Sequence, residues 1–257
     1  MQVHTRGDGE PTISIVGSIH GDEPAGKNAI EHILEENLTF NKPVQFVIAN
    51  EEALAADKRY LDVDLNRNFP GDPDSDTHEQ RLAAELVNVL QGTRVLDLHT
   101  THSYPEPFGI IKSLDEAALK RVQATGVENV IYFPNESGSL IDAIDGIVVE
   151  TGHQHTDEAM NNAIEVIKRY LGFYGVIDYD APTVEQDFYQ YTATVEGSGW
   201  EFTGENFIEV EQGEVFARKG SKEKRASEAF YPILMSTNGY EDQIGFQAKK
   251  ITPRQEI

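Results

Sequence analysis

The 257-residue chain contains no cysteine, which excludes disulfide bonds, thiolate metal sites and a cysteine nucleophile. Any metal ion bound by this protein must therefore be held by His, Asp and Glu. Long apolar runs are also missing, because no stretch approaches the ~20 residues that a membrane span requires. The first residues, MQVHTRGDGEPT, lack the basic head and apolar stretch of a secretory signal. We therefore expect a soluble, cytoplasmic protein.

Basic residues are scarce, because 21 Lys and Arg stand against 44 Asp and Glu, for a formal net charge of -23 at pH 7. Nucleic acids and anionic membranes present dense negative charge, so we expect neither as a partner. The acidic residues are scattered along the whole chain. They fit an ordinary solvated surface or, the interpretation we favour, adaptation to high salt, which screens self-repulsion within about 3 Å at 1 M.

The first two thirds of the chain alternate between apolar segments rich in β-branched residues and segments with helical periodicity. This alternation is typical of a doubly wound α/β domain, which we place at residues 1–172. The pattern predicts strands at 12–18, 44–50, 93–99, 129–133 and 146–150, and helices at 24–37, 81–91, 115–126 and 157–173.

The pattern changes after a linker at residues 173–186. Residues 187–257 contain short alternating segments separated by Gly-containing turns, which indicates a small all-β domain. Strands are predicted at 188–195, 199–202, 206–210, 215–220, 231–236 and 244–249.

Two histidines and one glutamate follow predicted strands. His20 and Glu23, in the segment HGDE, come after the strand at 12–18, and His99 ends the strand at 93–99. Open α/β sheets bind ligands at the carboxyl ends of their strands, so these side chains would meet there. Two His and one carboxylate form the ligand set of a catalytic zinc site. Non-haem iron uses the same ligand types, and HGDE alone also fits an ordinary polar turn.

Glu150 ends another predicted strand, GIVVE, where a carboxylate after four apolar residues is costly without a partner. It would serve as a general base, with a fourth metal ligand or a structural ion pair as alternatives. A polar loop at residues 58–71 carries Arg59 and Arg67. Arg67 offers a bidentate fork for a carboxylate, and Arg59 is a candidate to stabilise an oxyanion. Asp64 would orient this loop or a metal-bound histidine.

Four short motifs occur in order along the chain: HGDE, DLNRNFPG, DLHTT and VVETG. With these motifs the chain resembles the succinylglutamate desuccinylase and aspartoacylase family of the zinc carboxypeptidase clan, and RYLDVDLNRNF is an especially close match. The resemblance covers nearly the whole chain, because that family also carries a small C-terminal β domain. It implies a zinc-carboxypeptidase-like doubly wound α/β domain followed by a small all-β domain.

The resemblance also implies roles for single residues and one Zn²⁺ per chain. By similarity, the metal ligands are His20, Glu23 and His99, the catalytic residues are Glu150 and Arg59, and the substrate-binding residues are Asn66, Arg67 and Tyr240.

One substrate-binding arginine of the aspartoacylase-like proteins, shortly before the catalytic glutamate, has no counterpart. Residues 139–145, SLIDAID, contain no basic side chain. A second carboxylate on the substrate therefore lacks an obvious partner. This departure argues against N-acetylaspartate as the substrate and, less directly, against succinylglutamate.

These features together predict a zinc metallohydrolase that acts on non-peptide linear amide bonds. Its substrate would be a small anionic N-acyl amino acid, cleaved by water that zinc and Glu150 activate. A zinc carboxypeptidase acting on short peptides and a non-catalytic metal-binding domain are the alternatives.

Overall fold

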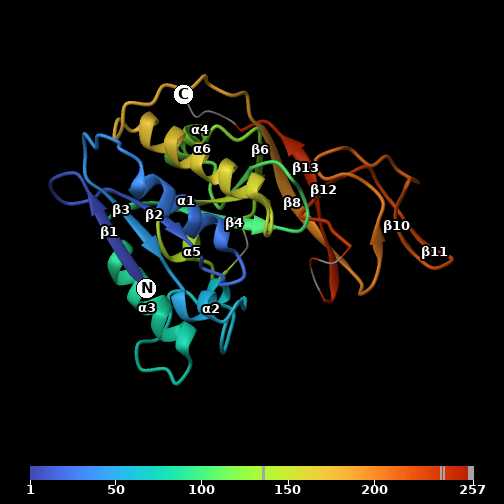
Figure 1. Cartoon of the computed structure of the whole chain (residues 1–257). Helices are drawn as coiled ribbons and strands as arrows, with labels where there is room; N and C mark the ends of the chain where they lie inside the picture. Colours follow the sequence, from blue (N-terminus) through green and yellow to red (C-terminus); the bar gives the residue numbers. More distant parts are fainter. Residues whose placement is uncertain (135–136, 238, 240, 254–257) are drawn as a thin grey trace.

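A ten-stranded mixed sheet forms the centre of the protein, for which a computed structural model describes residues 1–134, 137–237, 239 and 241–253 (Figure 1). The strands lie in the order β1-β3-β2-β4-β7-β5-β6-β8-β13-β12, and a second sheet has the order β11-β10-β9. The strands are β1 (Gln2–Arg6), β2 (Ile13–Gly17), β3 (Val44–Ile48), β4 (Arg94–Thr101), β5 (Phe108–Ile111), β6 (Asn129–Tyr132), β7 (Gly146–His153), β8 (Asp187–Glu196), β9 (Glu201–Phe202), β10 (Val215–Lys219), β11 (Lys222–Arg225), β12 (Tyr231–Ile233) and β13 (Gln243–Ile251). The helices are α1 (Pro24–Glu35), α2 (Glu51–Ala55), the 3-10 helix η1 (Leu65–Arg67), α3 (His78–Leu90), α4 (Glu116–Thr125), α5 (Leu140–Ala143) and α6 (Asp157–Phe173).

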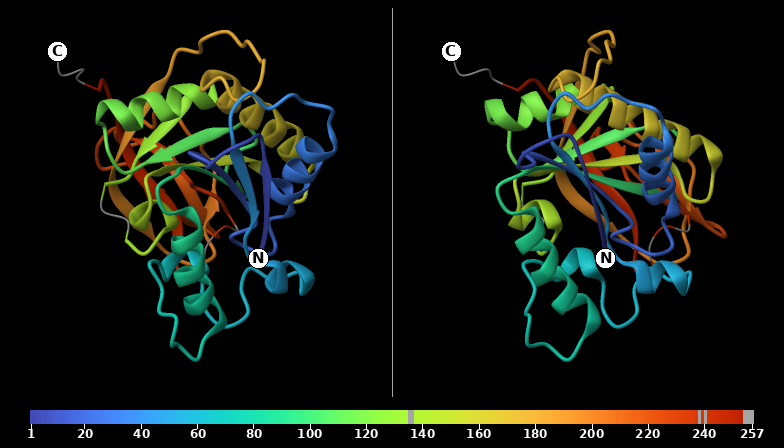
Figure 2. Two further views of the ribbon diagram at one scale, coloured as in Figure 1. Left: turned by 90° about the vertical axis from the view of Figure 1, so that its left-hand side faces the viewer. Right: turned by 60° about the vertical axis from the view of Figure 1, so that its left-hand side comes forward.

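Helices cover both faces of the N-terminal half of the sheet. The helices α1, α4 and α6 lie on one face, and α3 lies on the other (Figure 2). Strands β2 and β3 are therefore buried along their whole length, which explains their largely apolar sequences ISIVG and VQFVI. This arrangement confirms the predicted doubly wound α/β architecture.

The strands β2, β4 and β7 are parallel neighbours, so their carboxyl ends share one edge of the sheet. The register places His99 of β4 opposite Glu150 of β7. At the end of β2, a Cβ on Gly17 would lie 2.7 Å from the carbonyl carbon of Gly26 in α1. This close backbone contact, open only to glycine, holds the start of α1 and the turn at 18–23 against the edge.

The segment 187–257 continues the central sheet and also adds a smaller one. Strand β8 pairs in parallel with β6, and β13 and β12 extend the sheet beyond it in antiparallel fashion. The strands β9, β10 and β11 form the small separate sheet, as the predicted fold class requires. Strands from both sides of the linker predicted at 173–186 thus belong to one sheet. The division into a domain at residues 1–172 and another at 187–257 stays a prediction.

The strand predicted at 206–210 is wrong, because only Val210 pairs there, in an isolated bridge with Phe230. The chain turns instead, and the Asn206 side chain bonds to main-chain atoms of Ser103 and Met235. Strands β1, β5 and β11 were not predicted from the sequence. Strand β11, KEKR, is charged throughout and lacks the apolar alternation that marks a strand.

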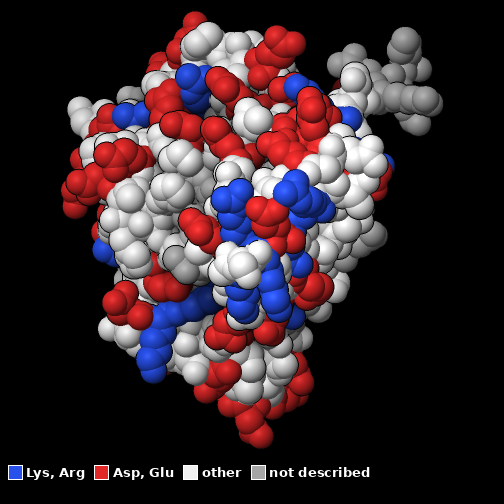
Figure 3. Space-filling model, turned by 90° about the vertical axis from the view of Figure 1, so that its right-hand side faces the viewer, with Lys and Arg blue, Asp and Glu red and all other residues white. Residues whose placement is uncertain are grey.

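Charge is unevenly distributed over the surface. On the face shown in Figure 3, Lys and Arg gather in the middle, and Asp and Glu spread over the remainder. The β10–β11 hairpin carries a group of basic residues, in the sequences VFARK and KEKR. Among the described residues, no helix combines the length and the apolarity needed to cross a membrane.

Candidate metal centre and substrate cavity

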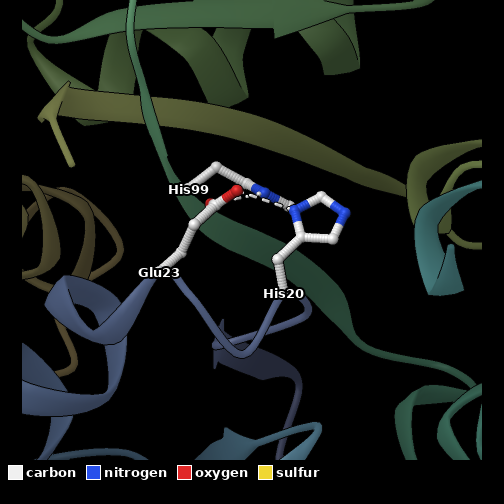
Figure 4. Close-up of side chains that lie close together, drawn as sticks. All are labelled: His20, Glu23 and His99. Carbon is white, nitrogen blue, oxygen red and sulfur yellow. Dashed lines mark hydrogen bonds and ion pairs between the residues drawn. The ribbon is translucent and has the colours of Figure 1, made fainter. Parts of the chain in front are cut away.

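His20, Glu23 and His99 come together at the carboxyl edge of the sheet, as Figure 4 shows. Glu23 Oε1 lies 2.8 Å from His20 Nδ1, and Glu23 Oε2 lies 3.1 Å from His99 Nδ1. All three side chains are buried, and one potential ligand atom from each lies within 4.8 Å of the others. Glu23 occupies the N-cap position of α1 without capping the helix, so its carboxylate remains available to the histidines.

Each imidazole is also held from its far side by a further carboxylate. His20 Nε2 lies 3.1 Å from Asp64 Oδ1, and His99 Nε2 lies 3.0 Å from Asp97 Oδ2. This arrangement fixes the ring orientation and directs both Nδ1 atoms toward one point, as carboxylate–histidine–metal groups do. The donor set therefore fits a divalent cation such as Zn²⁺.

The charges of these groups stabilise one another. Burial alone would raise the pKa of Glu23, but the imidazoles of His20 and His99 hold it well below its usual value. Burial opposes the charged form of His99, yet the carboxylates of Asp97 and Glu23 raise its pKa well above the usual range. A metal ion bound at His99 would have to displace a proton from that ring, so metal binding would release protons.

A loop from Arg59 to Asp64 lies beside the centre. Arg59 donates from Nε to Asp64 Oδ2 at 3.1 Å, and its NH1 lies 3.4 Å from Glu23 Oε1. Burial opposes its charge, but the carboxylates of Asp64 and Glu23 raise the pKa of Arg59, so it stays cationic. Asp64 therefore contacts both Arg59 and His20. Orienting the arginine loop and orienting a histidine had been predicted as alternative roles for it.

Glu79 of α3 holds this loop through its backbone N–H groups. Its carboxylate accepts the backbone N–H groups of Leu61, Asp62 and Val63 at 2.7, 3.0 and 3.2 Å. The side chain is fully buried. Burial alone would raise the pKa of Glu79, but the three backbone donors lower it below its usual value. Glu79 is thus an ionised anchor for the segment between Arg59 and Asp64.

Glu150 faces the same edge but lacks such partners. Its Oε2 is inaccessible to solvent and has no hydrogen-bond partner within the described part of the chain. Burial raises the pKa of Glu150 to about 8, against the opposing positive charges of His99 and Arg59. A proton-exchanging group in this pKa range is suited to general acid–base chemistry near neutral pH.

A cavity of about 480 Å³ surrounds these groups. Asn66 and Arg67 line it beside Arg59, and Asn66 Oδ1 accepts the backbone N–H of Leu140 at 2.9 Å. The lining also has apolar members, which come from β5, β7 and β13 and from the residues that directly follow β6 and β12. These members are Ile110, Phe133, Val148, Leu234 and Phe246.

The structure brings seven of the eight predicted site residues into this cavity. The eighth, Tyr240, lies outside the described residues. Three further residues at the site were not predicted from the sequence: Asp97, which contacts His99, Glu79, which holds the loop at 61–63, and Ser139, which lines the cavity. The alternation of Asp97 and His99 along β4, which places both side chains on one face, was the available signal for Asp97. Glu79 and Ser139 had no such local signal.

The fold and the site define an α/β protein with a two-histidine, one-glutamate candidate metal centre at the carboxyl edge of its sheet. Residues 9–171 match the model of the Succinylglutamate desuccinylase/Aspartoacylase catalytic domain. The chain therefore belongs to the succinylglutamate desuccinylase/aspartoacylase family, which confirms the resemblance inferred from the motifs.

Two curated relatives carry the names of amide-hydrolysing enzymes. The N-alpha-acetyl-L-2,4-diaminobutyric acid deacetylase of Halomonas elongata is 30% identical over 202 residues, covering 69% of this chain and 58% of that protein. The N-acyl-aromatic-L-amino acid amidohydrolase (carboxylate-forming) of Rattus norvegicus is 34% identical over 106 residues, covering 35% of this chain and 33% of that protein. The chain thus spans less than two thirds of either relative.

Solved structures share the fold over nearly the whole chain. A succinylglutamate desuccinylase/aspartoacylase from Rhodobacter sphaeroides has a TM-score of 0.79 at 20% identity, covering 97% of this chain and 89% of that one. Murine aminoacylase 3 has a TM-score of 0.75 at 22% identity, covering 95% and 97% of the two chains.

Proposed function

We propose that this protein is a zinc-dependent hydrolase that cleaves the amide bond of a small N-acyl amino acid. One observation carries the proposal: two imidazole Nδ1 atoms converge on the Glu23 carboxylate, beside a second carboxylate, Glu150, whose Oε2 has no partner among the described residues. The first group is suited to hold a metal ion, and the second to move a proton. The names of the two curated relatives support amide hydrolysis as the chemistry.

His20, Glu23 and His99 would hold one zinc ion. Bound there, zinc would supply a Lewis acid that acidifies water and polarises a carbonyl group. Glu150 takes a proton from the attacking water and delivers it to the departing nitrogen. Its pKa, raised by burial to about 8, suits the second step, and a nearby cation favours the ionised form needed for the first.

The two arginines act on different parts of the substrate in this proposal. The Arg59 guanidinium, held by Asp64 and Glu23, lies beside the centre and stabilises the negative charge that develops on the carbonyl oxygen. Arg67 and Asn66 also line the cavity and bind the substrate carboxylate. Asn66 Oδ1 already accepts from Leu140, so its amide nitrogen is the group that would donate to the carboxylate.

The lining favours a substrate with one carboxylate and one apolar group. Among the described lining residues, Arg59 and Arg67 are the only Lys or Arg. Because Arg59 acts on the carbonyl oxygen and Arg67 binds the first carboxylate, a second substrate carboxylate has no guanidinium to bind it. The apolar wall around Ile110, Val148 and Phe246 would receive an apolar acyl group or amino-acid side chain instead. The rat relative is named for N-acyl-aromatic amino acids, which combine one carboxylate with an apolar side chain.

A hydrolysis screen over N-acetyl and N-succinyl amino acids and short peptides, with zinc-loaded protein at low and high salt, tests the proposal. We expect turnover of N-acetyl derivatives of apolar amino acids, with N-acetylaspartate poorer. Glu150→Gln should lower kcat by about 10²–10⁴-fold and still bind zinc, because Glu150 acts on the proton and is no ligand. Preferential cleavage of peptides, or an active Glu150→Gln variant, would refute the proposal.

A further inference from the structure

Ser139 has a buried hydroxyl that serves no structural purpose in the described part of the chain. The residue is 1% exposed, and its Oγ has no hydrogen-bond partner among the described residues. It lines the cavity that contains the candidate metal centre. Buried hydroxyls are normally hydrogen-bonded, so an unpaired one in a cavity wall points to a partner that enters the cavity.

The position of Ser139 makes its unpaired hydroxyl more informative. Ser139 is the N-cap residue of the short helix α5, with the extended φ of -82° and ψ of 162° that such residues adopt. A serine here normally accepts a hydrogen bond from a backbone N–H of the first turn. Its side chain makes no capping bond, and only its carbonyl oxygen accepts from Asp142 N. Within the described residues, the hydroxyl is therefore not used by local structure.

Both neighbours of Ser139 contact residues 66–69, here called the receptor segment because it carries Asn66 and Arg67, the proposed ligands of the substrate carboxylate. Leu140 N donates to Asn66 Oδ1 at 2.9 Å, and the carbonyl oxygen of Gly138 accepts Phe69 N at 3.0 Å. Gly138 has a φ of +79°, and a Cβ there would lie 2.5 Å from the carbonyl oxygen of Arg67. Ser139 is thus fixed between two direct contacts with the receptor segment.

We propose that Ser139 Oγ is a third hydrogen-bond donor to the substrate carboxylate, beside Asn66 and Arg67. A carboxylate has about four acceptor sites, so three donors can share it, and the serine hydroxyl rotates about its bond to meet one of them. This inference rests on the proposed function. In the stretch 139–145, which has no basic residue, an uncharged hydroxyl would then take part in recognising the carboxylate.

Ser139→Ala tests the inference, with Ser14→Ala as a matched control. Ser14 is equally buried, but its Oγ is bonded to Thr93 Oγ1 at 2.6 Å and to Gln45 Nε2 at 2.7 Å, away from the cavity. We expect Ser139→Ala to raise the KM for an N-acetyl amino acid about tenfold, with kcat and Tm unchanged. Ser14→Ala should lower Tm and leave KM unchanged.

A second substrate separates carboxylate recognition from a general change in the cavity. With an N-acetyl amino acid amide, which lacks the carboxylate, Ser139→Ala should change KM less than about twofold. An unchanged KM for the acid, or an equal increase for acid and amide, overturns the inference.

Calorimetric binding of the same N-acetyl amino acid distinguishes this inference from the proposed function. A Kd that weakens about tenfold in Ser139→Ala supports the inference even if the wild-type protein hydrolyses nothing, in which case only the proposed function fails. An unchanged Kd refutes the inference alone when the wild-type protein is active. A wild-type protein that does not bind the ligand refutes both.

Discussion

Replacing Glu79 by Gln should weaken both stability and turnover, although Glu79 lies outside the cavity lining. Its two carboxylate oxygens accept three consecutive backbone N–H groups, those of Leu61, Asp62 and Val63. A glutamine keeps one acceptor oxygen and turns an NH₂ group toward the remaining backbone donors. At least one of the three N–H groups would then lose its partner in a buried place.

The structure sets the size of the expected loss. A hydrogen bond to a charged group contributes about 1.5–3 kcal/mol, and a buried unsatisfied donor costs about 1–3 kcal/mol. We therefore expect Glu79→Gln to lower the free energy of unfolding by about 3 kcal/mol. For a chain of this size, that corresponds to a fall in Tm of about 6–12 °C.

The same change should lower kcat through Arg59, which is on the loop that Glu79 anchors. A displacement of about 1 Å in a catalytic group costs on the order of 10²-fold in rate, so we expect kcat to fall by about 10–100-fold. A double-mutant cycle with Arg59→Ala checks the route. In the Arg59→Ala background, Glu79→Gln should lower kcat no more than roughly twofold, because the positioned group is already gone. Equal effects in both backgrounds would refute a positioning role.

Acid titration gives an independent test of the anchor. The lowered pKa of Glu79 means that its ionised form stabilises the folded state above the unfolded-state pKa near 4.5. This contribution disappears as the pH falls through the lower folded-state value. The Tm difference between the wild type and Glu79→Gln should therefore be full at pH 7 and shrink steadily below about pH 4. A constant difference down to pH 2 would contradict an ionised anchor.

Two further predictions concern the metal centre and the surface. Asp97→Asn should weaken zinc binding about 10–100-fold in a chelator competition, because Asp97 fixes the ring of His99; an unchanged zinc affinity would show that this contact is dispensable. Thermal melts between about 0.1 and 2 M KCl should show a rising Tm, because salt screens the repulsion within a chain of net charge -23. A Tm that falls with KCl would contradict adaptation to high salt.

Much of the N-terminal fold could be predicted because its signals are local. Continuous apolar segments and helical periodicity identified β2, β3, β4, β6 and β7 and the four long helices to within a few residues. The missed strands β1 and β5 depend on pairing with strands distant in the sequence, whereas β11 pairs locally with β10 but lacks apolar alternation. The edge strand β1, for example, is largely exposed and is defined by its antiparallel pairing with β3.

The site was predictable where a residue type and a strand end coincided. His20 and Glu23 follow a buried strand, and His99 and Glu150 lie near the carboxyl ends of two others, so the parallel sheet brings them together. Glu79 acts through backbone atoms of a loop 16–18 residues earlier, and no sequence pattern marks that contact. Ser139 is distinguished by a missing capping bond, which only coordinates reveal.

The contrast among four carboxylates, two buried and two half-buried, is the strongest physical argument for the division of roles in this site. Glu23, Asp64 and Glu79 each receive several donors, and in each case those donors lower the pKa despite burial. Glu150 experiences the opposite balance, and burial raises its pKa to about 8. Groups with lowered pKa values stay ionised and are suited to hold a cation, a histidine or a loop in place. Glu150 is the one of these four that can gain and lose a proton near neutral pH, as an acid–base catalyst must.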